Sequence, residues 1–209
     1  MTGESRWWRF LWPAVLVAVP CLVYLQTLGY PFQYDDFHSI VDNYHLRDPR
    51  NLLAFFVDPT LFSARPEHAM YRPLLLVTLA LNWAVSGSAT WSYHLVNLAL
   101  HAGCGLLLWR IGHLLLGDRD AAGVGALVFA LHPINSEAVC YLSSRSETLA
   151  AFFVLLGFSL FLRRRQQGGG MVLLVAAFSA GLLAKSTAAV LPALILAHDL
   201  LWTPGQVGR

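Results

Sequence analysis

Residues 10–28 read FLWPAVLVAVPCLVYLQTL, an apolar stretch without a charged side chain. A membrane-spanning helix needs about 20 such residues to cross a hydrocarbon core of roughly 30 Å. Arg6 and Arg9 precede the stretch, which therefore resembles a signal peptide, but it is about as long as a full span and lacks a small-x-small cleavage site. We expect it to stay attached as the first membrane helix.

The composition of the whole chain is typical of a membrane protein. Of its 209 residues, 56% are hydrophobic and 12% are charged, whereas soluble domains carry about 25% charged residues. The formal net charge of +2 is too small to indicate a nucleic-acid partner. The three cysteines are scattered and show no spacing typical of a disulfide or a metal site. We therefore predict neither a metal nor a cofactor.

Further apolar runs follow one another without a long polar segment that would indicate a soluble domain. They cover residues 91–116, 121–131, 148–162, 171–184 and 187–202. We predict a single membrane domain over residues 1–209, an all-α polytopic bundle with about six spanning helices.

Residues 72–85 form a shorter run of fourteen residues, which as a helix of about 21 Å is too short to span comfortably. The positive-inside rule places Lys and Arg of short loops in the cytoplasm. If residues 72–85 do not cross, Arg110, Arg119 and residues 163–165 all fall on that side. If they do cross, Arg119 and the triple arginine lie on the wrong side. We therefore predict an interfacial helix over residues 72–85.

This topology places two polar loops on the non-cytoplasmic face. The first outer loop, residues 30–71, holds half of all Asp and Glu residues, and the second outer loop covers residues 132–147. Lys185 returns near the same face, where it either reaches the surface by snorkelling or meets a phosphate. We expect chemistry at this face, which is periplasmic in a bacterial inner membrane or luminal in the endoplasmic reticulum.

Tyr34-Asp35-Asp36 directly follows the first helix, so two adjacent carboxylates stand at the outer mouth of the bundle. A carboxylate near a dry interface can accept a proton from an acceptor hydroxyl. The alternative is that both carboxylates are ordinary solvated charges or a helix N-cap.

Glu137, Arg145 and Glu147 are the charged residues of the second outer loop. Arg145 could bind a phosphate through two parallel hydrogen bonds, and Glu137 could orient a sugar hydroxyl or that arginine. Because Ser144-x-x-Glu147 also has the pattern of a capping box, Glu147 is either a helix cap or part of a site.

His94, Asn97 and His101 recur at helical spacing and form one polar stripe along residues 91–116. Polar side chains inside a bilayer usually face the bundle interior. The stripe therefore either packs within the bundle or contacts a lipid head group. His132, at the start of the second outer loop, is a further candidate for head-group contact.

An ordered set of motifs resembles a known family, the transmembrane and tetratricopeptide-repeat protein O-mannosyltransferases, which are polytopic glycosyltransferases of the GT-C fold. The order and spacing of the motifs match over nearly the whole chain. The motifs are Tyr34-Asp35-Asp36, Tyr71-Arg72-Pro73-Leu74, His94-Leu95-Val96-Asn97 with His101, His132-Pro133 through Glu137, and Arg145 to Glu147.

The resemblance implies a GT-C-like helical bundle that moves a mannose-like hexose, with inversion, from a polyprenyl- or dolichyl-phosphate carrier to a hydroxyl acceptor on a protein Ser/Thr or a glycan. It implies that Asp35 or Asp36 is the base. We expect membrane lipids as the other partners. The candidate residues for the donor phosphate and sugar are Arg72, Glu137, Arg145, Glu147 and Lys185.

Members of this family usually continue into further membrane helices and a tetratricopeptide array, both of which lie outside these 209 residues. We therefore expect either a fragment or a chain that needs a partner chain for the missing half. The alternatives to an enzyme are a module that binds or transports a lipid-linked sugar and an inactive truncated fragment. Apart from Asp199, most charges lie near the ends of apolar runs, which favours an outer-face site over a conducting path.

Overall fold

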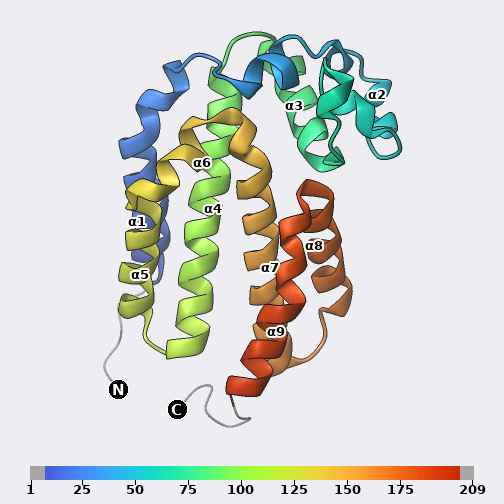
Figure 1. Ribbon diagram of the computed structural model, residues 1–209. Helices are drawn as coiled ribbons and strands as arrows, with labels where there is room; N and C mark the ends of the chain where they lie inside the picture. Colours follow the sequence, from blue (N-terminus) through green and yellow to red (C-terminus); the bar gives the residue numbers. More distant parts are fainter. Residues whose placement is uncertain (1–7, 203–209) are drawn as a thin grey trace.

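A computed structural model describes residues 8–202, and every regular element in that range is a helix. The long helices α1, α4 and α7 run alongside one another, and shorter helices pack beside them (Figure 1). This confirms the all-α class. The principal helices are α1 (Trp8–Tyr24), α3 (Pro73–Ser86), α4 (Trp91–Leu116), α5 (Arg119–Leu131), α7 (Arg145–Gln167), α8 (Met171–Ala184) and α9 (Val190–Leu201).

Three segments of the described chain are long and apolar enough to cross a bilayer, namely Phe10–Gly29, Trp91–Leu116 and Leu142–Gln167. A fourth span results if Arg119–Leu131 and Pro133–Cys140, which are bent by 54°, count as one broken helix. The remaining apolar helices are shorter, and a helix of 14 residues such as α8 reaches about 21 Å. The predicted count of about six spans is therefore not confirmed by helix length.

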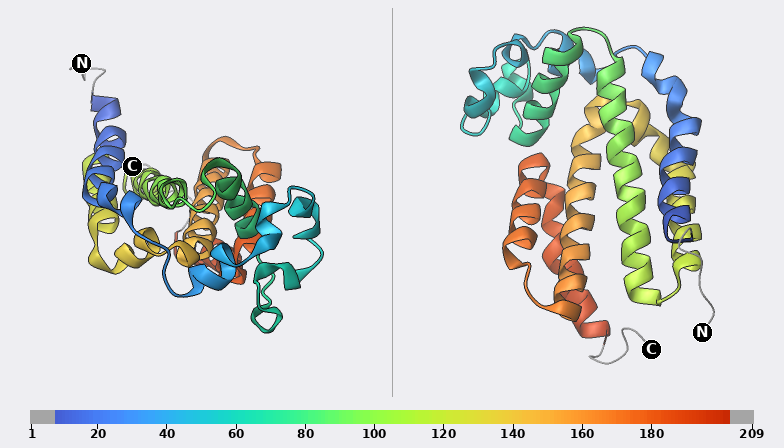
Figure 2. Two further views of the ribbon diagram at one scale, coloured as in Figure 1. Left: turned by 90° about the horizontal axis from the view of Figure 1, so that it is seen from above. Right: turned by 180° about the vertical axis from the view of Figure 1, so that it is seen from behind.

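The turns at one end of the bundle follow from residues that stop and start helices. Gly117 ends α4 with φ 72°, a left-handed conformation that suits glycine. The Asp118 side chain then accepts hydrogen bonds from the N–H groups of Asp120 and Ala121 and so caps α5. The α4–α5 and α7–α8 turns lie at this end (Figures 1 and 2). Arg119 begins α5 after the first of these turns, and residues 163–165 stand near the end of α7 before the second.

The first outer loop lies at the opposite end of the bundle, where α7 also begins (Figures 1 and 2). Arg119 and residues 163–165 therefore lie at the end of the bundle away from the first outer loop, although that loop itself contains Arg47, Arg50 and Arg65. Which end faces the cytoplasm stays a prediction. Arg6, which contributed to the same argument, lies outside the described residues.

The first outer loop is folded into a compact layer. Ile40, Phe55 and Phe62 are buried and belong to one apolar core with Leu75 and Leu79 of α3. Because burial of such a side chain contributes about 1.5–3 kcal/mol, this core holds the loop in place beside α3. η1 (Leu25–Gly29) continues α1 up to the loop, whose own short elements are η2 (Phe37–Val41), η3 (Tyr44–Arg47), α2 (Asn51–Ala54), η4 (Pro59–Phe62) and η5 (Pro66–His68).

Helix α3 occupies the residues predicted for the interfacial helix. Pro73 stands in its first turn, where a missing N–H leaves no helical bond unmade. The helix lies at the outer-loop end of the bundle and contacts α4, α7 and α8 (Figure 1). Its placement at a membrane interface stays a prediction.

The second outer loop leads from α5 back to α7 through short helical turns. It consists of η6 (Pro133–Asn135), α6 (Ser136–Cys140) and η7 (Leu142–Ser144). The α6 segment packs on α4, and η7 contacts α4 and α7. Residues 141–147 are thereby brought against the first outer loop, where the acidic pair lies.

Candidate active site

The Asp35-Asp36 pair stands on an unusual turn at the start of the first outer loop. Tyr34 has φ 44°, in the left-handed region that residues other than glycine rarely adopt. The chain then enters η2, a single π-helical turn, which is an element frequently found at functional sites. This backbone gives two neighbouring carboxylates very different surroundings.

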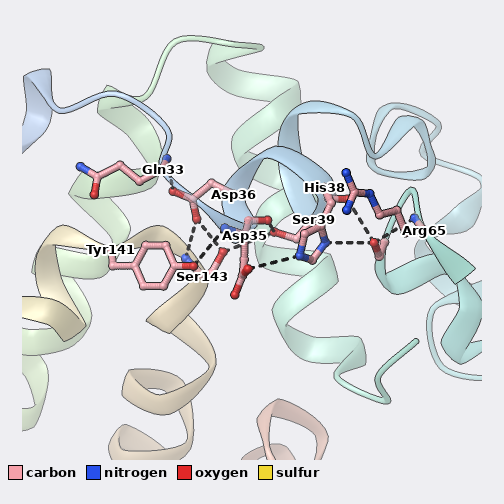
Figure 3. Close-up of polar contacts among 9 residues, drawn as sticks. Gln33, Asp35, Asp36, His38, Ser39, Arg65, Tyr141 and Ser143 are labelled. Atoms are coloured by element: carbon pink, nitrogen blue, oxygen red, sulfur yellow. Dashed lines mark hydrogen bonds and ion pairs between the residues drawn. The ribbon is translucent and has the colours of Figure 1, made fainter. Parts of the chain in front are cut away.

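Asp36 is buried between the two outer loops. It is 1% exposed, and its carboxylate accepts hydrogen bonds from the Ser143 N–H at 2.9 Å, the Ser143 hydroxyl at 2.6 Å and the Gln33 N–H at 3.0 Å (Figure 3). Burial raises the pKa of Asp36, although these hydrogen bonds act in the opposite direction. Asp36 therefore ties the two loops together.

Asp35 presents its carboxylate to solvent. Its side chain is 67% exposed and lies with Oδ1 3.5 Å from Nε2 of His38. Its backbone is fixed, since its N–H donates to the Tyr141 hydroxyl at 3.1 Å and its carbonyl accepts from the Ser39 hydroxyl at 2.6 Å (Figure 3). The exposed carboxylate is therefore free to come within hydrogen-bond distance of a hydroxyl that enters from solvent, as a general base must.

Asp35 lines a cavity of about 230 Å³, here called the main cleft. The main cleft is enclosed by both outer loops, α3, the start of α7 and the end of α8. Among residues 8–202, no group of three or more His, Cys, Asp or Glu side chains is arranged to hold a metal ion. The lining residues are Asp35, His38, Ser39, Phe62, His68, Met70, Arg72, Leu75, Leu79, Tyr141, Ser143, Ser144, Ser146, Glu147 and Lys185.

Two cations share the main cleft with Asp35. Arg72 donates from Nη1 to the Ser146 hydroxyl at 3.0 Å, and Lys185 forms an ion pair with Glu147. Burial lowers the pKa of Arg72, and burial together with the nearby Arg72 charge lowers the pKa of Lys185. Because a partly desolvated pair of cations is stabilised by added negative charge, this part of the cleft suits a phosphate.

A second cavity, of about 430 Å³, shares Asp35 and Tyr141 with the main cleft. Its other lining residues are Gln33, Tyr34, Glu137 and Cys140. This side hollow contains the exposed carboxylate of Glu137 and no Lys or Arg among its lining residues. Asp35 therefore stands between a cleft that contains Arg72 and Lys185 and a hollow whose lining has acidic and aromatic side chains without a cation.

An apolar groove of about 460 Å³ adjoins the main cleft at Glu147. It follows α7 between α4, α5 and the start of α9. Apart from Glu147 and Thr187, its lining is apolar: Leu108, Phe129, Ala150, Ala151, Val154, Leu155, Ala188 and Val190. A hydrocarbon chain could lie in such a groove without exposing polar backbone groups.

Arg145 lies outside all three cavities. Its side chain is fully buried and donates to Asn97 Oδ1 at 2.7 Å, Asn82 Oδ1 at 2.6 Å and the Tyr93 carbonyl at 2.8 Å. A weaker bond reaches the Thr78 hydroxyl at 3.3 Å. We therefore assign the guanidinium to the junction of α3, α4 and α7, in place of the phosphate contact expected from the sequence.

The polar stripe of α4 faces the bundle interior. His94 lies 3.2 Å from the Tyr30 carbonyl and His101 lies 2.9 Å from the Ala130 carbonyl, each through Nε2, while Asn97 binds Arg145. These side chains are at most 2% exposed. The stripe thus packs within the bundle and does not reach a lipid head group.

Of the remaining candidate residues, His132 has a local structural role and Glu147 lines the main cleft. His132 is exposed and caps η6 by accepting the Ile134 N–H on Nδ1. The capping-box interpretation of Ser144-x-x-Glu147 is wrong, since Ser144 makes no side-chain cap bond to α7 and Glu147 pairs with Lys185.

Sequence reasoning missed His38, His68 and Tyr141, which all line the main cleft. His38 follows Asp35 by three residues, and side chains at this spacing share one face of a helical turn. That signal was available in the sequence. Tyr141 and His68 reach the cleft by tertiary folding, and no spacing in the sequence predicts this.

Comparison with known proteins finds similarity to mannosyltransferases, as the sequence motifs predicted. Residues 67–208 match the family model described as dolichyl-phosphate-mannose-protein mannosyltransferase. The chain is similar to protein O-mannosyl-transferase TMTC2 of Mus musculus, with 36% identity over 149 residues. It is also similar to TMTC3 of Mus musculus and TMTC1 of Homo sapiens, each with 34% identity, over 147 and 151 residues.

These alignments cover 69–70% of this chain but only 16–18% of the relatives. The chain thus spans less than a fifth of the length of the curated proteins it matches. No solved structure matches it significantly.

Proposed function

The chain belongs to the protein O-mannosyl-transferase family, and we propose that it moves a mannose-like hexose from a polyprenyl- or dolichyl-phosphate carrier to a hydroxyl group, with Asp35 as the base. The acceptor is a protein Ser or Thr, and the main cleft opens at the non-cytoplasmic face. The observation that carries the proposal is the main cleft, where the exposed Asp35 carboxylate shares one cavity with Arg72 and Lys185.

The reaction is an inverting displacement at the anomeric carbon of the sugar. The acceptor oxygen forms a bond to this carbon while the bond between the carbon and the phosphate oxygen breaks, and its electron pair leaves with the phosphate. The hydroxyl proton passes to the Asp35 carboxylate. Arg72 and Lys185 stabilise the charge that develops on the phosphate.

The donor occupies two adjoining spaces. At about 230 Å³ the main cleft is smaller than a typical ligand pocket of roughly 300 Å³ or more, so it takes the sugar phosphate and leaves the lipid outside. The apolar groove begins at Glu147, which also lines the main cleft. The lipid chain lies along this groove, beside α7.

The acceptor enters from the side hollow. An inverting transfer needs the acceptor and the departing phosphate on opposite faces of the sugar, with the base beside the acceptor. Asp35 lines both cavities, and the cations lie in the main cleft alone. The side hollow therefore receives the hydroxyl, and its Glu137 carboxylate favours an acceptor with a basic residue near the modified Ser or Thr.

The test is transfer of radiolabelled mannose from dolichyl-phosphate mannose to a serine-rich peptide, in membranes that contain the 209-residue chain. We expect Asp35→Asn to lower kcat by about 10²–10⁴-fold, the usual contribution of a general base, with donor binding retained. Asp42→Asn is the matched control, because Asp42 is an exposed carboxylate of the same loop that lines none of the three cavities.

Each outcome separates the hypotheses. Transfer by Asp35→Asn at the wild-type rate would overturn the assignment of the base. A wild-type chain that inserts and binds the donor but transfers no mannose would instead be a module for binding lipid-linked sugar. A chain that binds no donor would exclude both functions.

A further inference from the structure

The Asp35 carboxylate is the exposed end of a short chain of polar side chains. Asp35 Oδ1 lies 3.5 Å from His38 Nε2 (Figure 3). The other ring nitrogen, Nδ1, lies 3.0 Å from the Ser63 hydroxyl. Asp35 lies just before η2 and His38 lies within it, whereas Ser63 follows η4. The first outer loop thus folds back to place a third residue behind the acidic site.

The hydrogen-bond geometry indicates which nitrogen of His38 carries the proton. The Ser63 oxygen accepts the Arg65 N–H at 3.0 Å. Its own hydroxyl proton can go to His38 Nδ1 at 3.0 Å or to the His38 carbonyl at 3.4 Å, and the shorter distance favours Nδ1. Since a neutral imidazole has one donor and one acceptor nitrogen, Nε2 then bears the proton, 3.5 Å from Asp35 Oδ1.

The imidazole is held firmly in this orientation. The His38 side chain is 15% exposed, and its ring stacks on the ring of His68 at 4.8 Å between centroids. The His38 carbonyl also accepts the Ala64 N–H at 2.9 Å. The donor group therefore cannot rotate away from the carboxylate without breaking contacts with two other segments of the loop.

Ser63 is not the reactive end of this chain, although the three residue types also occur in hydrolytic triads. Ser63 is 2% exposed and does not line the main cleft. Asp35, in contrast, is exposed and lines both the main cleft and the side hollow. The buried serine therefore orients the histidine, and the histidine orients the carboxylate.

We propose that His38 is a positioning residue for the base Asp35: it holds one carboxylate oxygen through Nε2–H, so that the other oxygen faces the acceptor hydroxyl. Ser63 sets the tautomer of His38. The role rests on the proposed function and adds a residue to it. An exposed aspartate without this contact samples several rotamers, and misplacement of a reacting group by about 1 Å can lower the rate by roughly 10²-fold.

The kinetic test compares His38→Ala with His38→Gln in the mannose-transfer assay. The glutamine amide keeps a donor near the place of Nε2, whereas alanine removes it. We expect His38→Ala to lower kcat about 10–100-fold with KM for the donor unchanged, and His38→Gln to restore most of the loss. His45→Gln is the control, because His45 lies in the same loop outside the main cleft.

A second measurement does not depend on turnover. In ¹⁵N NMR spectra of histidine-labelled chain in detergent, identified by their loss in His38→Gln, the His38 signals should report the Nε2–H tautomer. Ser63→Ala should shift the tautomer balance, and Asp35→Asn should shift the Nε2 resonance. A His38 ring that carries its proton on Nδ1, or that ignores both substitutions, would overturn the inference.

The outcomes distinguish this inference from the proposed function. If wild type transfers mannose and His38→Ala keeps the wild-type kcat, the positioning role is wrong and the function stands. If wild type transfers nothing while the NMR results are as expected, the function and the role both fail, and only the chain of polar contacts remains.

Discussion

Replacing Arg145 by leucine should destabilise the fold and leave donor affinity unchanged. The Arg145 guanidinium is fully buried and makes its short bonds to the side chains of Asn97 and Asn82 and to the Tyr93 carbonyl, at 2.6–2.8 Å. These acceptors belong to α3 and α4, whereas Arg145 opens α7. The side chain therefore joins three helices below the main cleft.

The magnitude follows from the two amide oxygens, those of Asn82 and Asn97, that would lose their donor. The Tyr93 carbonyl lies within α4 and keeps the N–H partner that the helix gives it. A buried acceptor left without a partner costs about 1–3 kcal/mol. Removal of a buried charge also relieves its desolvation, so we take the lower limit for each acceptor and expect about 2 kcal/mol in total. For a chain of this size, that corresponds to a fall in Tm of roughly 4–8 °C.

Thermal unfolding in detergent and equilibrium binding of dolichyl-phosphate mannose measure the two properties separately. Arg163→Leu is the control, since Arg163 is exposed at the opposite end of α7 and should change stability by less than about 0.5 kcal/mol. An Arg145→Leu variant with wild-type Tm and at least tenfold weaker donor binding would refute this reasoning. That result would support the interpretation from the sequence, in which Arg145 binds the donor phosphate.

Three further substitutions test other parts of the structure. Gly123→Ala should lower Tm, because an added Cβ would lie 2.1 Å from the Trp12 ring, whereas Gly125→Ala meets nothing within 4 Å and should leave Tm unchanged or higher. Asp36→Asn should alter the pH dependence of unfolding. Because the pKa of Asp36 is raised in the folded protein, its contribution to stability is full at acid pH and is lost as pH rises through the folded-state pKa. In chemical denaturation, the free energy of unfolding of wild type relative to the variant should therefore fall from acid to neutral pH. Glu137→Lys should reverse acceptor preference from serine peptides with a flanking lysine to those with a flanking glutamate, as measured by kcat/KM; equal preference in both chains would contradict the placement of the acceptor in the side hollow.

Much of the architecture could be predicted from the sequence because bilayer physics acts on local composition. A run such as residues 10–28 must form a helix if it enters hydrocarbon, where an unpaired backbone amide has no water to bind. The length of the apolar run and the charges around it predicted an interfacial helix over residues 72–85, and the structure has a helix at Pro73–Ser86. The number of spans could not be counted in this way, because α5, α8 and α9 are apolar but short.

The sequence by itself also placed the acidic pair at the outer-loop end of the bundle, and the order of motifs identified the family. The sequence could not show which of Asp35 and Asp36 faces the site, because two adjacent residues of the same type have nearly the same sequence around them. The tertiary structure distinguishes them. Ser143, more than a hundred positions away, donates two hydrogen bonds to the Asp36 carboxylate, whereas Asp35 lines the main cleft. The same holds for Arg145, whose partners come from two other helices. Whether a charged side chain serves the fold or the site depends on which distant groups reach it, and only the packing of helices and loops decides that.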